Sequence, residues 1–316
     1  MSIIMDEIER IERRLKLHDL RVLISVVEAG SMGKAAERLG TSQPAVSRTI
    51  ADLEYALGVR LLDRSPRGIE ATLYGRALIN RGIAAFDELR QGVKDIEFLA
   101  DPTTGEVRIG ASIAVAVGFV SAVIDQLSRR YPRLVFEVLD VDTDTAIRAL
   151  EERRVDLVIA HIIRPVDEEQ MNADVLLHEP HVVVTGIQSH WTRRRRLGLV
   201  DLMNEPWMLP PPDSPFGSVV LEAFRANGLD VPRTIVTSFF PVRNALLTTG
   251  RFLTMVPRVV LAFPTNNLAL KRLPIELPIT RRPLGVITLK NRTLSPVAQL
   301  FMDCAHKFAK ATAKEK

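Results

Sequence analysis

Residues 31–73 read SMGKAAERLGTSQPAVSRTIADLEYALGVRLLDRSPRGIEATL and contain closely spaced helix start and stop signals. Ser31 is a favourable N-cap because its hydroxyl accepts a backbone N–H, and Gly40 can end the same helix in the left-handed conformation. A preceding helix over 18–29 has apolar residues at helical spacing and stops at Gly30. The pattern predicts short helices joined by tight turns.

The next helix of this stretch has two distinct faces. Thr41 or Ser42 would cap it, and its first turn tolerates a proline. One stripe has spacings of four, three and four residues and can bury against the earlier helices, while a second stripe points about 140° away from it. The apolar stripe is Val46, Ile50, Leu53 and Leu57, and the second is Pro44, Ser47, Arg48 and Ala51.

The second stripe has the chemistry of a base-reading surface. Its small residues would let the helix approach base edges, where Gln43 can pair with adenine and Arg48 with guanine through two hydrogen bonds. Arg64 and Arg67 lie in a turn between two short strands, where they could contact phosphate or the minor groove. Three helices and a basic loop predict a winged helix-turn-helix that binds double-stranded DNA, although the helices alone also fit a polar surface.

The segment resembles the LysR-type transcriptional regulators. The resemblance rests on AAERLGTSQPAVSRTIADLEYALGVRLLDRSPRG and on the Thr72-Leu73-Tyr74-Gly75 step that follows it. It implies base contacts from the capped helix, groove or backbone contacts from the wing, and a phosphate contact from the helix before it. The implied DNA-binding residues are Lys34, Ser42, Gln43, Pro44, Ser47, Arg48, Arg64 and Arg67. An extension of about 15 residues before Leu17 departs from the family, and we assign it no function.

Composition restricts the protein class. The net charge is +4, but residues 1–75 carry 11 Lys and Arg against 11 Asp and Glu, so DNA binding must depend on local placement of cations. The single cysteine, Cys304, excludes an intrachain disulfide framework and a paired-cysteine zinc finger. The N-terminus lacks a signal-peptide core and no apolar run reaches about 18 residues, so we expect a cytoplasmic protein without a membrane partner.

A long helix is expected over 72–100, which contains no proline. It has apolar and small residues at alternating spacings of four and three, a pattern typical of helix pairing between subunits. The alternative is packing against its own domain. The resemblance favours a dimerising linker, and the protein is expected to be a homodimer or homotetramer. The seam is Leu78, Gly82, Ala85, Leu89, Gly92, Ile96 and Leu99.

Beyond Gly105 strands and helices alternate, which predicts an α/β domain with a mostly parallel sheet. This part resembles the effector domain of the family, which is similar to type 2 periplasmic binding proteins, with two lobes joined by two crossings. The expected domains are a winged helix-turn-helix at 1–73, a linker helix at 74–101 and an effector-binding domain at 105–316. Lobe I is placed at 105–177 plus 282–316, and lobe II at 178–281.

Ligands of open α/β sheets bind beyond the carboxyl ends of the strands. Hydroxyl groups and helix N-termini there suit a sugar or an organic anion as the effector, although each hydroxyl could instead be a helix cap. The residues expected to bind effector are Ala111, Ser112, His161, Phe216, Thr237 and Ser238.

Four histidines between 161 and 190 and the cations of 193–196 raise other possibilities. His178-Glu179-Pro180-His181 lacks helical ligand spacing, and we expect structural or surface histidines rather than a metal site. Residues 193–196 are expected to be a solvated segment, although they could touch DNA. No nucleotide or hydrolase motif is present, and no cofactor is expected.

Two functions remain from the sequence. The first is a LysR-type regulator whose DNA binding responds to a small molecule between the lobes, and which is not an enzyme. The alternative is a small-molecule binding protein or enzyme whose N-terminal helices form an interaction module. Failure to retard DNA together with turnover of a metabolite would distinguish the alternative.

Overall fold

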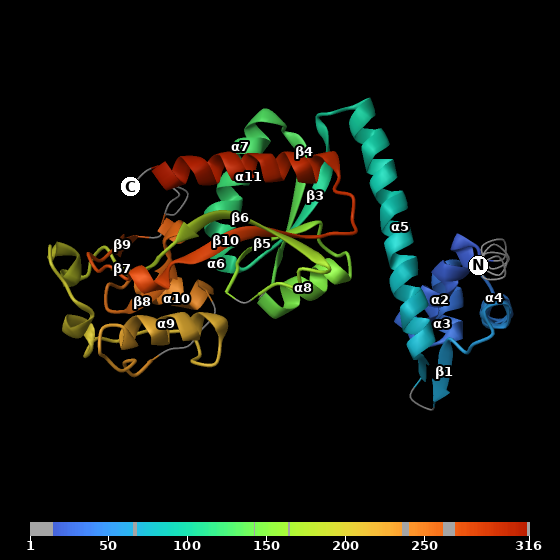
Figure 1. Cartoon of the computed structure of the whole chain (residues 1–316), viewed down its shortest axis with the longest axis horizontal. Coiled ribbons are helices and arrows are strands. Elements are labelled where there is room, and N and C mark those ends of the chain that lie inside the picture. The colour runs from blue at the N-terminus through green and yellow to red at the C-terminus, as the bar shows by residue number, and fades with distance from the viewer. Residues whose placement is uncertain are drawn as a thin grey trace. The chain divides into compact units, whose positions relative to one another are not determined.

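A computed structural model of the chain describes residues 15–65, 68–141, 143–163, 165–235, 240–261 and 269–314 (Figure 1). The chain forms two compact units, residues 1–92 and 93–316. Among the described residues, no helix is long and apolar enough to cross a membrane.

The first unit is a three-helix bundle followed by a hairpin. Ser31 Oγ accepts the Lys34 N–H at 3.3 Å, and Ser42 Oγ accepts the Ala45 N–H at 3.4 Å, so both predicted serine caps are confirmed. Gly30 ends the first helix with a φ of 67°. The elements are α2 (Leu17–Ala29), α3 (Met32–Leu39), α4 (Gln43–Leu57), β1 (Leu62–Ser65) and β2 (Gly68–Ala71).

The predicted apolar stripe of α4 forms the centre of this unit. Val46, Ile50 and Leu53 are buried against side chains of α2 and α3. On α2 the buried residues are Leu20, Val22, Leu23 and Val26, whereas Ile24 and Val27 are only half-buried. The result is a small, continuous core beneath α4.

The first half of helix α5 (Leu73–Ala100) differs from the expected subunit-pairing seam. Leu78 packs against the core of the first unit, and a Cβ on Gly82 would lie 3.4 Å from Ile24 Cδ1. The first half of the seam therefore packs within its own unit, as the alternative interpretation allowed. The second half remains exposed, with Leu89, Ile96 and Leu99 exposed by 53, 69 and 80%.

The second unit contains a five-stranded sheet of order β4-β3-β5-β10-β6. Its strands are β3 (Thr104–Ala111), β4 (Arg133–Asp140), β5 (Leu157–His161), β6 (Met171–Glu179) and β10 (Arg282–Leu289). Only β3, β4 and β5 are mutually parallel, because β10 returns from the second sheet and pairs antiparallel with β5 and β6. Three helices pack against strands of this sheet: α7 (Ser121–Arg130), α8 (Thr143–Glu151) and α11 (Pro296–Lys314).

The other sheet is entirely antiparallel, with order β8-β7-β9. It consists of β7 (His181–Gly186), β8 (Leu253–Pro257) and β9 (Leu270–Arg272), with α9 (Pro215–Arg225) and α10 (Phe240–Leu247). The expectation of a mostly parallel domain is therefore wrong. Outside the named strands, isolated bridges join Trp207 to Thr234 and to Leu253.

The helix after β3 approaches the second sheet closely. It runs through α6 (Ile113–Val115), a π-helical turn (Ala116–Val120) and α7. A Cβ on Gly118 would lie 2.6 Å from the Val259 carbonyl oxygen, which follows β8. Glycine is therefore required where this helix meets the segment after β8.

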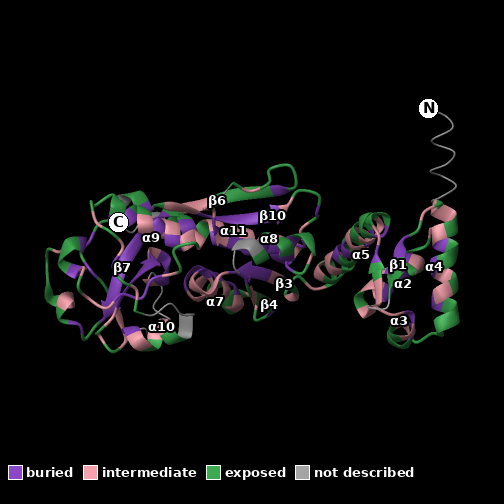
Figure 2. Cartoon of the chain, turned by 90° about the horizontal axis from the view of Figure 1, so that it is seen from below, coloured by how far each residue is buried: buried purple, intermediate pink, exposed green. Residues whose placement is uncertain are grey.

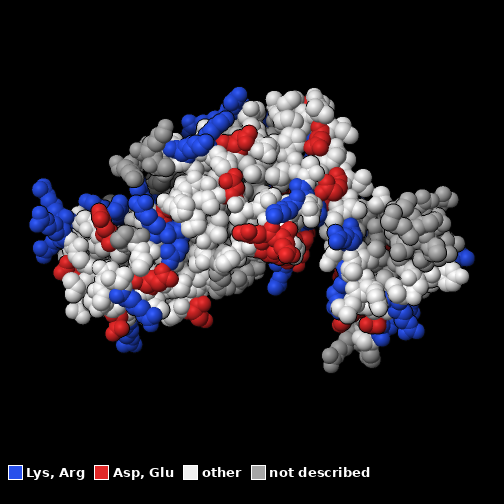
Figure 3. Space-filling view, in the orientation of Figure 1, with Lys and Arg blue, Asp and Glu red and all other residues white. Residues whose placement is uncertain are grey.

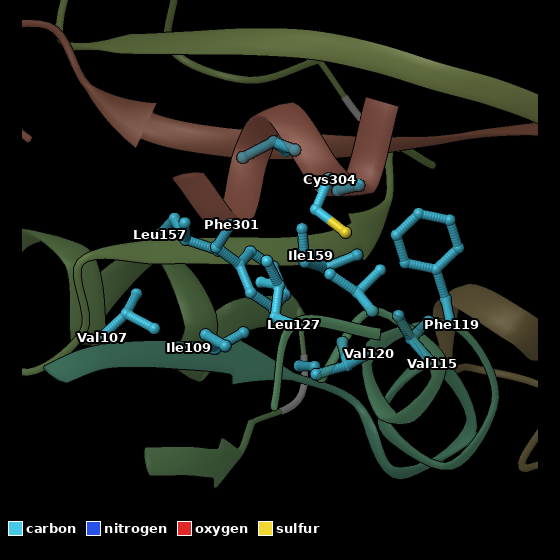
Figure 4. Packing of buried hydrophobic residues seen from close by; sticks show 14 of the residues in the cluster. Val107, Ile109, Val115, Phe119, Val120, Leu127, Leu157, Ile159, Phe301 and Cys304 are labelled. Atoms are coloured by element: carbon cyan, nitrogen blue, oxygen red, sulfur yellow. The ribbon is translucent and has the colours of Figure 1, made fainter. Parts of the chain in front are cut away.

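In the second unit, β7 and β10 are largely buried, whereas much of β6 is exposed (Figure 2). The core beside α11 includes Phe119, Ile159 and Phe301, with the Cys304 sulfur directed among them (Figure 4). Burial raises the pKa of the Cys304 thiol, so the apolar setting disfavours its thiolate. Cys304 therefore contributes to packing in this unit.

One buried ionic group lies directly before β5, the central strand of this sheet. Asp156 accepts the Arg108 backbone N–H at 2.8 Å and guanidinium hydrogen bonds from Arg108 at 2.9 Å and Arg292 at 2.6 Å. Burial raises the pKa of Asp156, but the bonds from Arg108 outweigh that effect and hold the pKa below its usual value. The carboxylate thus joins the start of β5 to β3 and to the chain after β10.

Candidate functional site

The N-terminal end of α4 is presented to solvent. Gln43, Pro44 and Arg48 are exposed and Ser47 is half-buried, on the side away from the buried stripe. Ser42 acts as the N-cap, so its hydroxyl is partly committed to the helix start. An exposed amide, an arginine and small neighbours on one helix face match the requirements of major-groove readout.

The hairpin β1–β2 is tied directly to α4. Glu54 Oε1 accepts the backbone N–H groups of Leu61 at 2.7 Å and Leu62 at 3.2 Å. Thr72 Oγ1 donates to the Arg60 carbonyl at 2.8 Å and accepts the Gly75 N–H at 3.0 Å. These bonds fix the base of the hairpin against α4 and against the start of α5.

Two of the predicted phosphate-contacting cations are accessible to a ligand in the first unit. Lys34 at the start of α3 and Arg64 in β1 are exposed. Arg67 lies outside the described residues. On the face of the first unit shown in Figure 3, basic and acidic side chains both occur. The placement of individual cations therefore matters more than overall charge.

A second cluster lies where the chain passes between the two sheets of the second unit. His161 Nε2 and Glu179 Oε1 are 2.6 Å apart, and Glu179 Oε2 accepts the Val259 N–H at 2.7 Å. His161 and Glu179 are both buried. One carboxylate thus connects the end of β5, the end of β6 and the segment after β8.

His181 starts β7 directly after that crossing. Its backbone N–H donates to Thr280 Oγ1 at 3.0 Å, and its ring Nδ1 lies 3.3 Å from the Thr280 carbonyl oxygen. A carbonyl can only accept, so Nδ1 carries the proton and Nε2 keeps a lone pair. Burial, with the nearby His161, lowers the pKa of His181 to about 3, so the ring is neutral near pH 7.

A pocket of about 150 Å³ opens beside His181. Phe216 from the first turn of α9 and Arg243 from α10 line it, and Ala114 from α6 closes it from the first sheet's side. Burial lowers the pKa of Arg243 to about 10, which leaves the guanidinium charged at neutral pH. The other lining residues are Met208, Leu209, Pro210, Pro211, Val220, Met255 and Pro257.

The structure brings some of the predicted ligand residues to this pocket. Phe216 lines it, and the His161 ring lies behind it, with centroids 5.7 Å from Phe216 and 6.0 Å from His181. Ala111 is buried at the end of β3 and Ser112 is half-buried before α6, and neither lines the pocket. Thr237 and Ser238 lie outside the described residues.

Sequence reasoning missed most of the lining. Met208, Arg243 and Met255 follow no strand-end pattern and converge only because the antiparallel sheet brings distant segments together. His181 carried a usable signal, since it starts an apolar strand directly after the predicted crossing. The sequence pattern predicts only a structural or surface histidine at this position.

The structure also describes the surroundings of the histidine pair, of residues 193–196 and of Trp207. His178 is exposed while His181 is buried, so this histidine pair does not share one environment. Residues 193–196 are exposed, as expected for a solvated segment. Trp207 is fully buried and donates its indole N–H to the Leu202 carbonyl at 2.8 Å, so it packs within the second unit.

Comparisons with known proteins match both units of the chain. Residues 17–76 match the model for the bacterial regulatory helix-turn-helix protein, lysR family, and residues 100–310 match the LysR substrate binding domain. The chain belongs to the LysR family of transcriptional regulators.

Relatives of this LysR-family chain are similar along most of their length. It is 30% identical over 294 residues to the HTH-type transcriptional regulator GbpR of Azospirillum brasilense, covering 92% of this chain and 85% of that protein. It is 24% identical to TdcA of Escherichia coli K12, covering 93% of each chain. The solved structure of CbnR, a LysR family transcriptional regulator, shares the fold with a TM-score of 0.63, 19% identity and coverage of 93% and 99%.

Proposed function

We propose that this LysR-family regulator reads DNA with the exposed face of α4 and the adjoining wing. The observation that carries the proposal is the division of α4 into a buried stripe and an exposed stripe that bears Gln43 and Arg48. The Glu54 bonds support it, because they hold the wing in one position relative to that face. Lys34 and Arg64 would add phosphate contacts.

Gel retardation with the chain's own upstream DNA tests this placement. Arg48→Ala should lower affinity for the specific site by about 5- to 150-fold, the effect of losing one bidentate base contact, and relax sequence preference. Arg129→Ala is the matched control, because this exposed arginine lies on α7 of the other unit and pairs with the exposed Asp125 one turn earlier on the same helix. Unchanged operator binding by Arg48→Ala would refute the proposed base readout.

The pocket beside His181 is the proposed effector site. It lies where Ala114 of α6 meets residues of the second sheet, so a ligand there would contact both parts of the unit. We place the domain limits at 1–73, 74–101 and 105–316, with lobes exchanging near 177–178 and 281–282. A ligand can change DNA binding only if it binds two arrangements of the protein unequally.

We further propose an oligomer formed through the exposed part of α5, because one recognition helix reads too few base pairs for specificity. We also propose a cytoplasmic location, which a role in DNA binding supports. The His161–Glu179 pair supports a positioning role rather than catalysis, because the second carboxylate oxygen is held by the Val259 N–H.

A further inference from the structure

We propose that the effector pocket takes a small carboxylate that also carries a hydroxyl group. The carboxylate would pair with Arg243, the hydroxyl would donate its hydrogen bond to His181 Nε2, and the hydrocarbon part would lie among the apolar lining. The proposal rests on the assignment of this pocket as the effector site. It goes further by choosing one ligand class among sugars, acids and amino acids.

Arg243 provides the anion-binding group. Its side chain lines the pocket from α10, and burial opposes its charge, as the lowered pKa of about 10 records. No described Asp or Glu lines the pocket. The guanidinium can offer a carboxylate ligand planar, charge-assisted hydrogen bonds. Phe216 adds to this preference, since the positive end of the α9 dipole lies at its position in the first turn.

His181 provides the hydroxyl-binding group. The Nδ1 proton is committed to the Thr280 carbonyl, so Nε2 can act only as an acceptor. His181 is only 3% exposed, and Nε2 has no hydrogen-bond partner among the described residues. It lies on the edge of the ring turned away from Thr280. A buried acceptor without a donor is costly, and a ligand O–H would satisfy it.

Size and lining chemistry exclude the competing classes. An apolar cavity of about 150 Å³ holds a molecule the size of benzene, so this pocket suits about six or seven non-hydrogen atoms. A hexose is larger, and most of its hydroxyls would face Met208, Val220 or Met255. An amino acid could donate its ammonium to His181, but that second cation would lie beside Arg243 with no described carboxylate in the lining.

Calorimetric titration of the full-length protein tests the ligand class. The probes are 2-hydroxybutyrate and 3-hydroxybutyrate, compared with butyrate, 2-aminobutyrate and D-galactose. We expect at least one hydroxybutyrate to bind about tenfold more tightly than butyrate, the effect of one hydrogen bond. Binding of 2-aminobutyrate and galactose should be weaker than that of butyrate.

Two substitutions separate the contacts. His181→Asn keeps an N–H near the Nδ1 position for Thr280 and removes the Nε2 acceptor, so it should abolish the preference for hydroxybutyrate over butyrate while butyrate affinity stays the same. Arg243→Met should weaken both acids about 100-fold. Arg129→Ala should change neither. Retained preference in His181→Asn, or unchanged acid binding in Arg243→Met, would overturn the proposal.

DNA binding distinguishes the two levels of inference. If galactose binds in preference to the acids, or no acid binds, while the protein still retards its operator, the ligand class is wrong and the regulator assignment stands. If the protein fails to retard DNA, the proposed function fails whatever the calorimetry shows. A hydroxybutyrate that binds as predicted should also shift the gel-retardation curve or the footprint.

Discussion

Replacing Glu54 with alanine should loosen the wing without altering any DNA-facing residue. The substitution removes the acceptor of the Leu61 and Leu62 N–H groups, whose residues are only 1% and 6% exposed. A hydrogen bond to a charged group contributes about 1.5–3 kcal/mol. Glu54 is half-exposed, so water can replace part of each bond, and we expect a loss of about 2–4 kcal/mol.

Thermal unfolding of the full-length protein measures this loss. For a domain of this size, about 1 kcal/mol shifts Tm by roughly 4–8 °C, so Glu54→Ala should lower the melting temperature of the first unit by about 8–32 °C. Circular dichroism would follow the helices of both units. The fluorescence of Trp191 and Trp207 would follow the second unit alone, because both tryptophans of the chain lie there. That signal should be unchanged.

Two variants control for other causes. Glu54→Gln retains an acceptor oxygen and should recover stability to within about 1 kcal/mol of the wild type. Asp52→Ala removes an exposed carboxylate from the same helix and should have little effect. The reasoning is refuted if Glu54→Ala melts with the wild-type protein, or if Asp52→Ala is destabilised as strongly. Operator affinity of Glu54→Ala, measured below its melting temperature, should fall as the wing loses its fixed position.

Two further predictions concern the second unit and α5. The folded pKa of His181 is about 3 against 6.5 unfolded, so below pH 6.5 the unfolded chain binds the extra proton and stability falls as pH decreases toward 3. Between pH 6.5 and 5 the loss in the free energy of unfolding is about 2 kcal/mol, at roughly 1.4 kcal/mol per pH unit. Urea titrations followed by tryptophan fluorescence should show a shallower decline of this free energy with falling pH in His181→Asn. Parallel curves for the variant and the wild type would contradict the lowered pKa of His181. Ile96→Glu should reduce the oligomer mass measured by light scattering and weaken operator binding, whereas the neighbouring exposed Glu97→Gln should leave the mass unchanged. An unaltered mass in Ile96→Glu would exclude this part of α5 from the interface.

Local signals predicted the first unit well. The caps at Ser31 and Ser42, the stop at Gly30 and the apolar stripe of α4 depend on residues a few positions apart, and the structure has them as expected. The packing partner of the apolar seam on α5 is harder to predict. Its spacing shows that one face is apolar but does not show which neighbour covers that face, and α2 covers the part at Gly82.

The second unit required information that a sequence pattern lacks. Strand β6 gives a weak sequence signal, because most of it is exposed and its residues do not form an apolar run. The parallel prediction failed because β10 pairs between β5 and β6 only after the chain has returned from the second sheet. The pocket depends on the same long-range closure, so strand-end rules located Phe216 and His161 but not Arg243.

The burial of Cys304 makes the natural protein suitable for site-specific labelling. It is the single cysteine of the chain, it is 6% exposed, and burial keeps its pKa high, so it should react slowly with maleimides at neutral pH. A new cysteine at an exposed position such as Asp213 would then be the only fast-reacting thiol. A fluorophore there could report ligand binding in a protein whose core has not been altered.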